Sequence, residues 1–95
     1  MPFSQTDATH TYVFTGSWNA IAGVYGIMNA QKQMIYVGQT DDFKRRMAEH
    51  QADTSHKMHK YSPALVWAEV ISGGEAVRRT RETQLIAEYN PPANG

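Results

Sequence analysis

The sequence contains no cysteine, which excludes disulfide bonds and thiolate metal sites. This absence fits a reducing compartment, and we expect a cytoplasmic protein. No apolar run approaches the ~20 residues that a membrane span needs, so we expect no membrane insertion. The stretch Met1 to His10 also lacks the basic-then-apolar pattern of a secretion signal, and we expect no export.

The sequence also lacks net charge, because nine basic residues balance nine acidic ones. Phosphate neutralisation supplies most non-specific affinity for nucleic acid, so neutrality argues mildly against a stand-alone nucleic-acid-binding protein. The basic residues are clustered, however, at 44–46, 57–60 and 78–81. These clusters are either solvated helix faces or parts of a locally positive surface, and the sequence leaves both interpretations open.

The 95 residues suffice for one domain with a modest core, and an apolar content of 41% is too high for a disordered chain. We predict an α+β fold, with a three-stranded, mostly antiparallel sheet flanked by two main helices, in residues 18–95. Residues 1–17 form an N-terminal extension that includes a candidate edge strand. The predicted strands lie at 23–28, 34–38 and 64–71, and the predicted helices at about 42–51 and 75–89.

The first two predicted strands form a hairpin in which each strand carries a tyrosine. Alternate residues of a strand share a face. A register that places Ile35 and Val37 together on the core side brings Tyr25 and Tyr36 onto one common face, where their rings are close enough to meet.

The first predicted helix carries an unusual stripe, formed by Phe43, Arg46, Met47 and His50 at the spacing i, i+3, i+4, i+7. A guanidinium on a buried stripe is costly unless an anionic group meets it. This stripe therefore suggests a site for an anion.

The second predicted helix carries an apolar stripe of Val77, Leu85, Ile86 and Tyr89. Glu82 lies three and four residues before Leu85 and Ile86, so it borders this stripe rather than opposing it.

Five polar residues therefore point inward. Taken singly, each has an ordinary explanation: a buried tyrosine or histidine is usually structural, and a helical glutamate is usually solvated. Together they supply a cation for a phosphate, a carboxylate for a hard metal ion, and phenol and imidazole groups for proton transfer. Phosphodiester cleavage needs such a set. The five residues are Tyr25, Tyr36, Arg46, His50 and Glu82.

The order of these residues resembles that of a GIY-YIG endonuclease domain. The resemblance rests on Gly23-Val24-Tyr25, Tyr36-Val37-Gly38, the segment 42–50, and a closing segment, 82–94, with a glutamate, a proline and an asparagine. It runs from about residue 22 to residue 94, so residues 1–17 lie outside it. Valine replaces isoleucine in both tripeptides, which is a common variation in the family.

The resemblance implies a role for each of the five residues. Glu82 would be the sole protein ligand of one Mg²⁺ or Mn²⁺ ion, which suits a cation that keeps several waters. Tyr25 would be the general base that activates water, although a free tyrosine has a pKa of ~10 and would need help from its neighbours. Arg46 would clamp the scissile phosphate. His50 and Tyr36 would assist in positioning and proton relay.

Other residues would support the site or the substrate. Asn94 would tether the C-terminal segment, Gly38 would keep the backbone open beside the phosphate, and Gly23 would allow a tight entry to its strand, although both glycines could be plain turn residues. His56 and His59 form an H-x-x-H pair that falls short of a zinc site, and their loop would instead contact the nucleic-acid backbone. The candidate backbone contacts are Lys44, Arg45, Lys57 and Lys60.

The resemblance implies a metal-dependent endonuclease that hydrolyses DNA phosphodiester bonds. Two alternatives remain: a DNA-binding or targeting module with the same fold but weak or no turnover, which the neutral charge favours, and a structural domain with no nucleic-acid role. No segment resembles a known sequence-reading motif. Specificity is therefore expected from a protein partner, a homodimer, the loop at 52–62 or the N-terminal extension, and a preference for DNA over RNA is left open.

Overall fold

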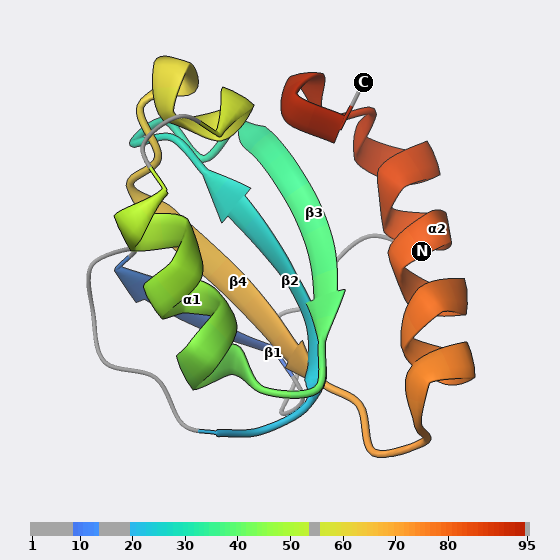
Figure 1. Ribbon diagram of the computed structural model, residues 1–95. Coiled ribbons are helices and arrows are strands. Elements are labelled where there is room, and N and C mark those ends of the chain that lie inside the picture. Colours follow the sequence, from blue (N-terminus) through green and yellow to red (C-terminus); the bar gives the residue numbers. More distant parts are fainter. Residues whose placement is uncertain (1–8, 14–19, 54–55, 95) are drawn as a thin grey trace.

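A four-stranded antiparallel sheet forms the centre of the molecule (Figure 1). The computed structural model describes residues 9–13, 20–53 and 56–94. The strand order is β1-β4-β2-β3. The elements are β1 (Thr9–Val13), β2 (Gly23–Met28), β3 (Met34–Thr40), α1 (Phe43–Ala52), the 3₁₀ helix η1 (Lys57–Tyr61), β4 (Leu65–Val70), α2 (Glu75–Tyr89) and the 3₁₀ helix η2 (Pro92–Asn94).

This architecture confirms the predicted α+β fold. Strands β2, β3 and β4 are the three predicted antiparallel strands, and β1 adds a fourth at the edge by pairing with β4. The observed ends of α1, α2, β2, β3 and β4 lie within two residues of the predicted ones. Within the described residues, no helix is both long enough and apolar enough to cross a membrane.

Helix α1 begins within one residue of its predicted start, and Asp42 caps it. The Asp42 side chain accepts a hydrogen bond from the backbone N–H of Arg45 at 3.0 Å, which satisfies one of the free donors at the helix start. Phe43, Met47 and His50 are buried along one side of the helix. The predicted stripe is therefore the surface through which α1 packs on the sheet.

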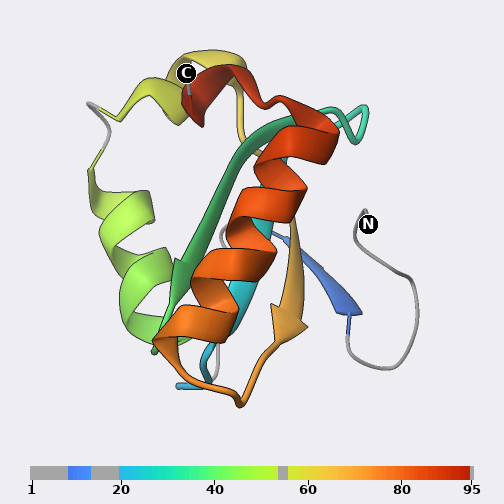
Figure 2. The same ribbon diagram turned by 90° about the vertical axis from the view of Figure 1, so that its right-hand side faces the viewer.

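The two helices cover opposite faces of the sheet, as the two views in Figures 1 and 2 show. Tyr25 and Ile27 of β2 pack with residues of α1, whereas Val24 of the same strand packs with Leu85 of α2. Because alternate residues of a strand point to opposite faces, β2 is buried on both sides. Every residue of β2 is accordingly buried.

A β-bulge interrupts the pairing of β2 with β3. Ile27 lies opposite Tyr36, but the next residue, Met28, lies opposite Met34. One residue of β3, Ile35, is therefore extra, and a residue inserted in this way turns the side chains on either side of it out of simple alternation.

The bulge corrects one prediction and leaves another standing. Ile35 joins the apolar cluster under α1, whereas Val37 joins the cluster under α2, so the prediction that these two residues share a face is wrong. Tyr25 and Tyr36 do lie on one face, with their ring centroids 6.2 Å apart. The predicted meeting of the two tyrosines is confirmed.

Helix α2 packs on the sheet through its C-terminal half. Leu85 is fully buried, and Ile86 and Tyr89 pack against the same cluster. Val77, predicted to belong to this stripe, is 49% exposed, and this part of the prediction is wrong. Val77 lies in the first turns of the helix, where it borders a shallow apolar hollow with Ile71 instead of the sheet.

A half-buried ion pair ties α2 to β4. Arg81 donates from Nε to Glu69 Oε2 at 2.8 Å and from Nη2 to Glu69 Oε1 at 3.2 Å, and the two side chains are only 15% and 14% exposed. Such two-pronged pairing fixes geometry as well as charge. The backbone of the same glutamate lies against Gly23 of β2, where any side chain would overlap its carbonyl oxygen.

The contact at Gly23 generates a prediction about stability. Gly23→Ala is expected to lower the free energy of unfolding by roughly 1–3 kcal/mol, because the new Cβ would overlap the Glu69 carbonyl oxygen, which cannot rotate away. Urea unfolding measures the loss. Gly73→Ala is the matched control, because its Cβ would meet only the exposed side chain of Val77. Equal losses in the two variants would show that overlap with the Glu69 carbonyl oxygen is not the cause.

Candidate active site

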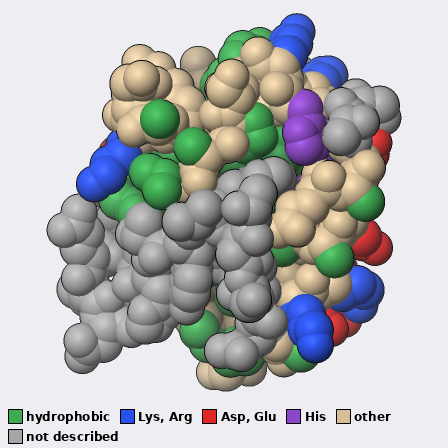
Figure 3. Space-filling view, turned by 90° about the vertical axis from the view of Figure 1, so that its left-hand side faces the viewer, with side chains coloured by type: hydrophobic (Ala, Val, Ile, Leu, Met, Phe, Trp, Pro, Cys, Tyr) green, Lys and Arg blue, Asp and Glu red, His purple; other side chains and the backbone are tan. Residues whose placement is uncertain are grey.

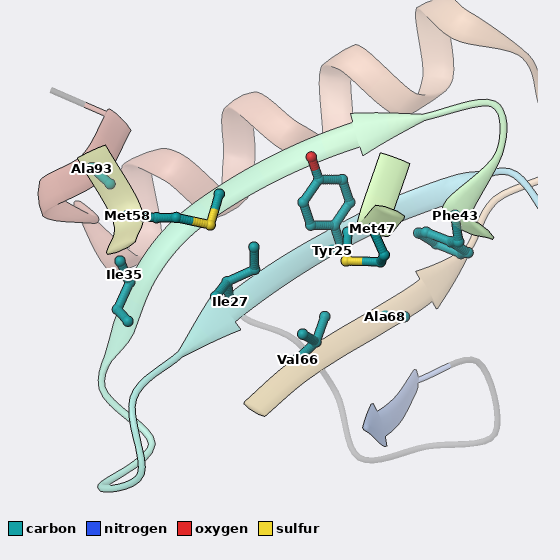
Figure 4. Packing of buried hydrophobic residues seen from close by; sticks show 9 residues of the cluster. All are labelled: Tyr25, Ile27, Ile35, Phe43, Met47, Met58, Val66, Ala68 and Ala93. Carbon is teal, nitrogen blue, oxygen red and sulfur yellow. The ribbon is translucent and has the colours of Figure 1, made fainter. Parts of the chain in front are cut away.

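The hydroxyl of Tyr25 is the centre of the candidate site. Tyr25 is fully buried, and its hydroxyl points away from Val66 and Ala68 at the base of the apolar cluster (Figure 4). Its oxygen lies 2.7 Å from Nε2 of His50, and Nε of Arg46 donates to it at 3.3 Å. Strand β2 and helix α1 thus bring three of the five predicted residues into direct contact.

A group of aromatic rings closes around this hydrogen bond. The ring centroid of Tyr36 lies 5.5 Å from that of His50 and 5.0 Å from that of His56, and the two histidine rings are 5.4 Å apart. All three contacts are edge-to-face, the favoured geometry for such rings. Tyr36 therefore belongs to the same cluster as Tyr25, as the sequence predicts.

The H-x-x-H pair supports His50 from the side. His59 Nε2 is hydrogen-bonded to the backbone oxygen of His50 at 2.8 Å, and His56 Nδ1 accepts a hydrogen bond from the backbone of Met58 at 3.1 Å. No group of three or more metal-ligating His, Asp or Glu side chains occurs in the part of the chain that the structure describes. The pair thus packs against the site, through its contacts with His50 and Tyr36.

Burial controls the protonation of Tyr25. Burial, and then the nearby Tyr36, raise the pKa of the Tyr25 phenol well above its usual value, and the hydrogen bond from Arg46 offsets this only in part. The expected help from a neighbouring cation, Arg46, is therefore present, but burial raises the pKa of Tyr25 by more than Arg46 lowers it. In the free protein Tyr25 is a neutral phenol.

Burial also keeps His50 neutral. Burial, followed by the positive charge of Arg46, lowers the pKa of the His50 imidazole to about 3. Because Arg46 can only donate, it takes a lone pair of the Tyr25 oxygen and leaves the hydroxyl hydrogen free. All three groups are satisfied when Tyr25 donates this hydrogen to Nε2 of His50.

Arg46 connects the buried tyrosine to an open cavity. Its Nη1 donates to Glu49 Oε1 at 3.0 Å, and its side chain is 35% exposed. The cavity, of about 560 Å³, lies between the end of β3, helix α1 and the start of α2. Arg45 and Arg78 also line it, so three arginines face one hollow.

Glu82 lies on α2, which packs on the opposite face of the sheet from α1. It is half-buried, and burial raises the pKa of its carboxyl group, partly offset by Arg79 and by a hydrogen bond to the backbone of Gln39. Its negative charge in turn contributes to the raised pKa of Tyr25, so the two groups are near enough to interact. The structure thus brings Glu82 to the β3 edge, beside the α1 cluster but outside its hydrogen bonds.

Two small structural devices hold β3 in place beside Tyr25. Asn94 accepts a hydrogen bond from the N–H of Val37 and donates one to its C=O, both at 2.8 Å, so its amide imitates a neighbouring strand. At Gly38 a side chain would overlap the Tyr25 hydroxyl. Gly38 therefore makes room for Tyr25 itself, which is a more specific reason for the glycine than an open backbone.

The four candidate backbone contacts lie at the surface. Lys44, Lys57 and Lys60 are exposed, and Arg45 is paired with Asp41 at 2.5 Å. On the face drawn in Figure 3, basic and acidic side chains are interspersed among the described residues and form no continuous patch of one sign. This face therefore offers scattered cations rather than a positive stripe.

Two residues at the site were not assigned to it from the sequence. His56 packs against Tyr36 and His50, and only the H-x-x-H spacing drew attention to it. Arg78 lines the cavity and donates from Nε to the side-chain oxygen of Gln39 at 3.0 Å. Its position four residues before Glu82, on the same side of the helix, was the available signal.

The sequence of this domain matches a known family. Residues 21–95 match the model of the GIY-YIG catalytic domain. The chain therefore belongs to the GIY-YIG family, and the predicted resemblance to its nuclease domains is confirmed.

Curated proteins similar to this chain include the UvrABC system protein C of Pseudomonas savastanoi pv. phaseolicola (strain 1448A / Race 6) and that of Pseudomonas syringae pv. syringae (strain B728a). Each is 29% identical over 84 residues, which cover 85% of this chain and 14% of the relative. The chain thus spans only a small part of the length of the curated relatives it matches.

The lowered pKa of His50 generates a prediction about pH. The unfolded imidazole binds a proton near its ordinary pKa, whereas the folded one does so only near pH 3. Neutral His50 therefore makes its full contribution to the free energy of unfolding above about pH 6.5. This contribution falls on acidification, by up to about 1.4 kcal/mol per pH unit. Urea unfolding between about pH 7 and pH 4 should show a shallower pH dependence for His50→Gln than for the wild type. An imidazole NMR signal of His50 that titrates near pH 6.5 would contradict this result.

Proposed function

We propose that this chain is a metal-dependent endonuclease that hydrolyses DNA phosphodiester bonds. The observation that carries the proposal is the hydrogen-bonded set of Tyr25, His50 and Arg46, in which Arg46 also opens onto the arginine-lined cavity. The first two residues can move a proton and the third can bind a phosphate. Membership of the GIY-YIG family supports the same reaction class.

Arg46 is proposed to hold the scissile phosphate. Its fork of donors matches the geometry of phosphate oxygens and stays charged at any working pH. In the free protein Nη1 donates to Glu49, an exposed pair of the kind that contributes about 0–1 kcal/mol. A phosphate can therefore replace Glu49 at small cost, while Nε keeps its contact with the Tyr25 oxygen.

Tyr25 and His50 are proposed to accept the proton of the attacking water as a pair. Tyr25 is a neutral phenol, so it can take a proton only if its own hydrogen passes to Nε2 of His50, 2.7 Å away. The low pKa of His50 opposes this transfer in the free protein. A phosphate beside Arg46 would offset the positive charge that lowers that pKa, and so would make His50 a better base.

Glu82 is proposed to hold a single Mg²⁺ or Mn²⁺ ion. The carboxylate fits this role, because it is half-buried, its charge is disfavoured by burial, and a cation would relieve that cost. One carboxylate is enough for a cation that keeps several waters and also binds substrate oxygens. When bound, the ion would supply a Lewis acid for the phosphate oxygens.

Specificity is proposed to depend on a protein partner or a second copy of the chain. The chain covers only 14% of relatives whose name identifies them as component C of the UvrABC system. A component of a system works with others, and this supports a partner for the present domain as well. The scattered cations on the face drawn in Figure 3 are consistent with weak binding by the domain alone.

Removing the proposed metal ligand should abolish cleavage without unfolding the protein. Glu82→Gln is expected to lower the rate of Mg²⁺-dependent DNA cleavage at least ~10²-fold, as loss of one transition-state contact does. A gel assay on duplex, flap, branched and single-stranded DNA measures the rate. Glu88→Gln is the control, because Glu88 is an exposed glutamate of the same helix. Unchanged cleavage by Glu82→Gln would overturn the metal assignment, and binding without cleavage by the wild type would favour a targeting module.

Removing the proposed base should separate binding from turnover. Tyr25→Phe is expected to lower cleavage roughly 10²–10⁴-fold, the usual contribution of a general base, while DNA binding remains. The loss of stability should be about 1–3 kcal/mol, because Arg46 and His50 lose a buried partner. Tyr61→Phe, which changes an exposed tyrosine, should leave both properties unchanged. Retained cleavage by Tyr25→Phe would exclude this tyrosine as the base.

A further inference from the structure

The cavity beside Arg46 has walls of balanced charge. Three arginines and three carboxylates line it. Arg45 is paired with Asp41, and Arg46 is paired with Glu49. The third lining carboxylate belongs to Glu75, and its partner, Arg79, does not line the cavity. One of the three lining arginines is therefore without an ion-pair partner among the described residues.

That arginine is Arg78. Its Nε donates to the side-chain oxygen of Gln39 at 3.0 Å, an uncharged acceptor. Within the described residues it forms no ion pair at contact distance, and its two terminal nitrogens donate to no protein acceptor. Arg45 has the larger effect in lowering the pKa of Asp41, and the charge of Arg78 still helps to lower it. A guanidinium anchored through Nε presents its terminal nitrogens in a fixed fork, the geometry that suits phosphate oxygens.

Gln39 places Arg78 next to the proposed reaction site. Its backbone hydrogen-bonds Glu82, and its side chain accepts from Arg78. Arg78 and Glu82 are four residues apart on α2, so they are neighbours on one side of the helix. Gln39 also follows Gly38, against which the Tyr25 hydroxyl packs. An anion at Arg78 would therefore lie one helical turn from the proposed metal ligand.

We propose that Arg78 binds a second phosphate of the nucleic-acid strand, adjacent to the scissile phosphate held by Arg46. This inference rests on the proposed function, which supplies the nucleic acid, and it assigns Arg78 to substrate positioning rather than to chemistry. A strand held at two successive phosphates is fixed in direction as well as in place. Arg78 thereby helps to determine which phosphodiester bond meets Tyr25.

The test compares two neighbouring arginines of α2 in the 95-residue chain. Binding of a short fluorescein-labelled DNA duplex is measured by anisotropy in EDTA, across a series of salt concentrations. Arg78→Gln is expected to reduce the slope of log Kobs against log[salt] by about 1, the value for one lost phosphate contact. Arg79→Gln is the matched control, because it removes the same charge from an exposed position outside the cavity. Arg78→Lys should restore the slope, since it keeps the charge.

Turnover in Mg²⁺ gives a second measurement. Arg78→Gln should raise KM and leave kcat unchanged, as expected for uniform binding of substrate and transition state. Equal salt slopes for Arg78→Gln and Arg79→Gln would overturn the inference, even if the wild type cleaves DNA. A wild type that binds DNA but never cleaves it would overturn the proposed nuclease, while the slopes still decide the role of Arg78. A wild type that does not bind DNA would overturn both.

Discussion

The hydrogen bond between Tyr25 and His50 joins β2, a strand that is buried along its whole length, to helix α1. A hydroxyl in the core is costly unless it has a partner, and Tyr25 is fully buried. His50 and Arg46 meet this requirement from successive turns of α1, and Phe43 and Met47 complete the same buried stripe. The rotation of α1 on the sheet thus buries the apolar stripe and satisfies this hydroxyl at the same time. The residues best suited to proton transfer and phosphate binding are therefore also residues that the fold needs.

The edge of strand β3 explains why the remaining groups gather where they do. An edge strand leaves a row of backbone donors and acceptors without a neighbouring strand. Asn94 takes both outward groups of Val37, and Glu82 takes a backbone bond from Gln39. The C-terminal half of the chain thus protects the edge, and in doing so it brings a carboxylate beside the cluster on α1. The contacts that protect the β3 edge are therefore also the ones that place Glu82 for its proposed role.

The periodic features of the site could be predicted from the sequence, because periodicity reports which side of an element is buried. The stripe on α1 and the meeting of Tyr25 with Tyr36 are of this kind. The bulge at Ile35 could not be predicted, because register depends on both strands and on the turn between them. In that turn the side chain of Asn29 accepts hydrogen bonds from two backbone N–H groups, and Lys32 adopts a positive φ of 64°.

The hydrogen-bond and ion-pair partners of the charged side chains could not be predicted from the sequence either. The basic run at 78–81 reads as one cluster, yet its three arginines have three different partners. Arg79 pairs with Glu75 on its own helix, Arg81 with Glu69 on β4, and Arg78 with an amide on β3. The direction of the Tyr25 pKa shift was hidden for the same reason, since burial outweighs the nearby cation only once packing is known.

The paired charges of the cavity bear on how a neutral domain can act on a polyanion. A wall of unpaired arginines would attract any phosphate backbone, and the attraction would fall steeply with salt. Here Asp41 and Glu49 hold two of the arginines. Under the proposed function, phosphates would displace these carboxylates, which would remain near the cavity and repel further phosphates. Under the proposed function, binding would depend on how well individual phosphates fit the guanidinium forks rather than on the overall field. Such a cavity would determine where a strand lies but contribute little affinity, and most of the affinity would come from the proposed partner.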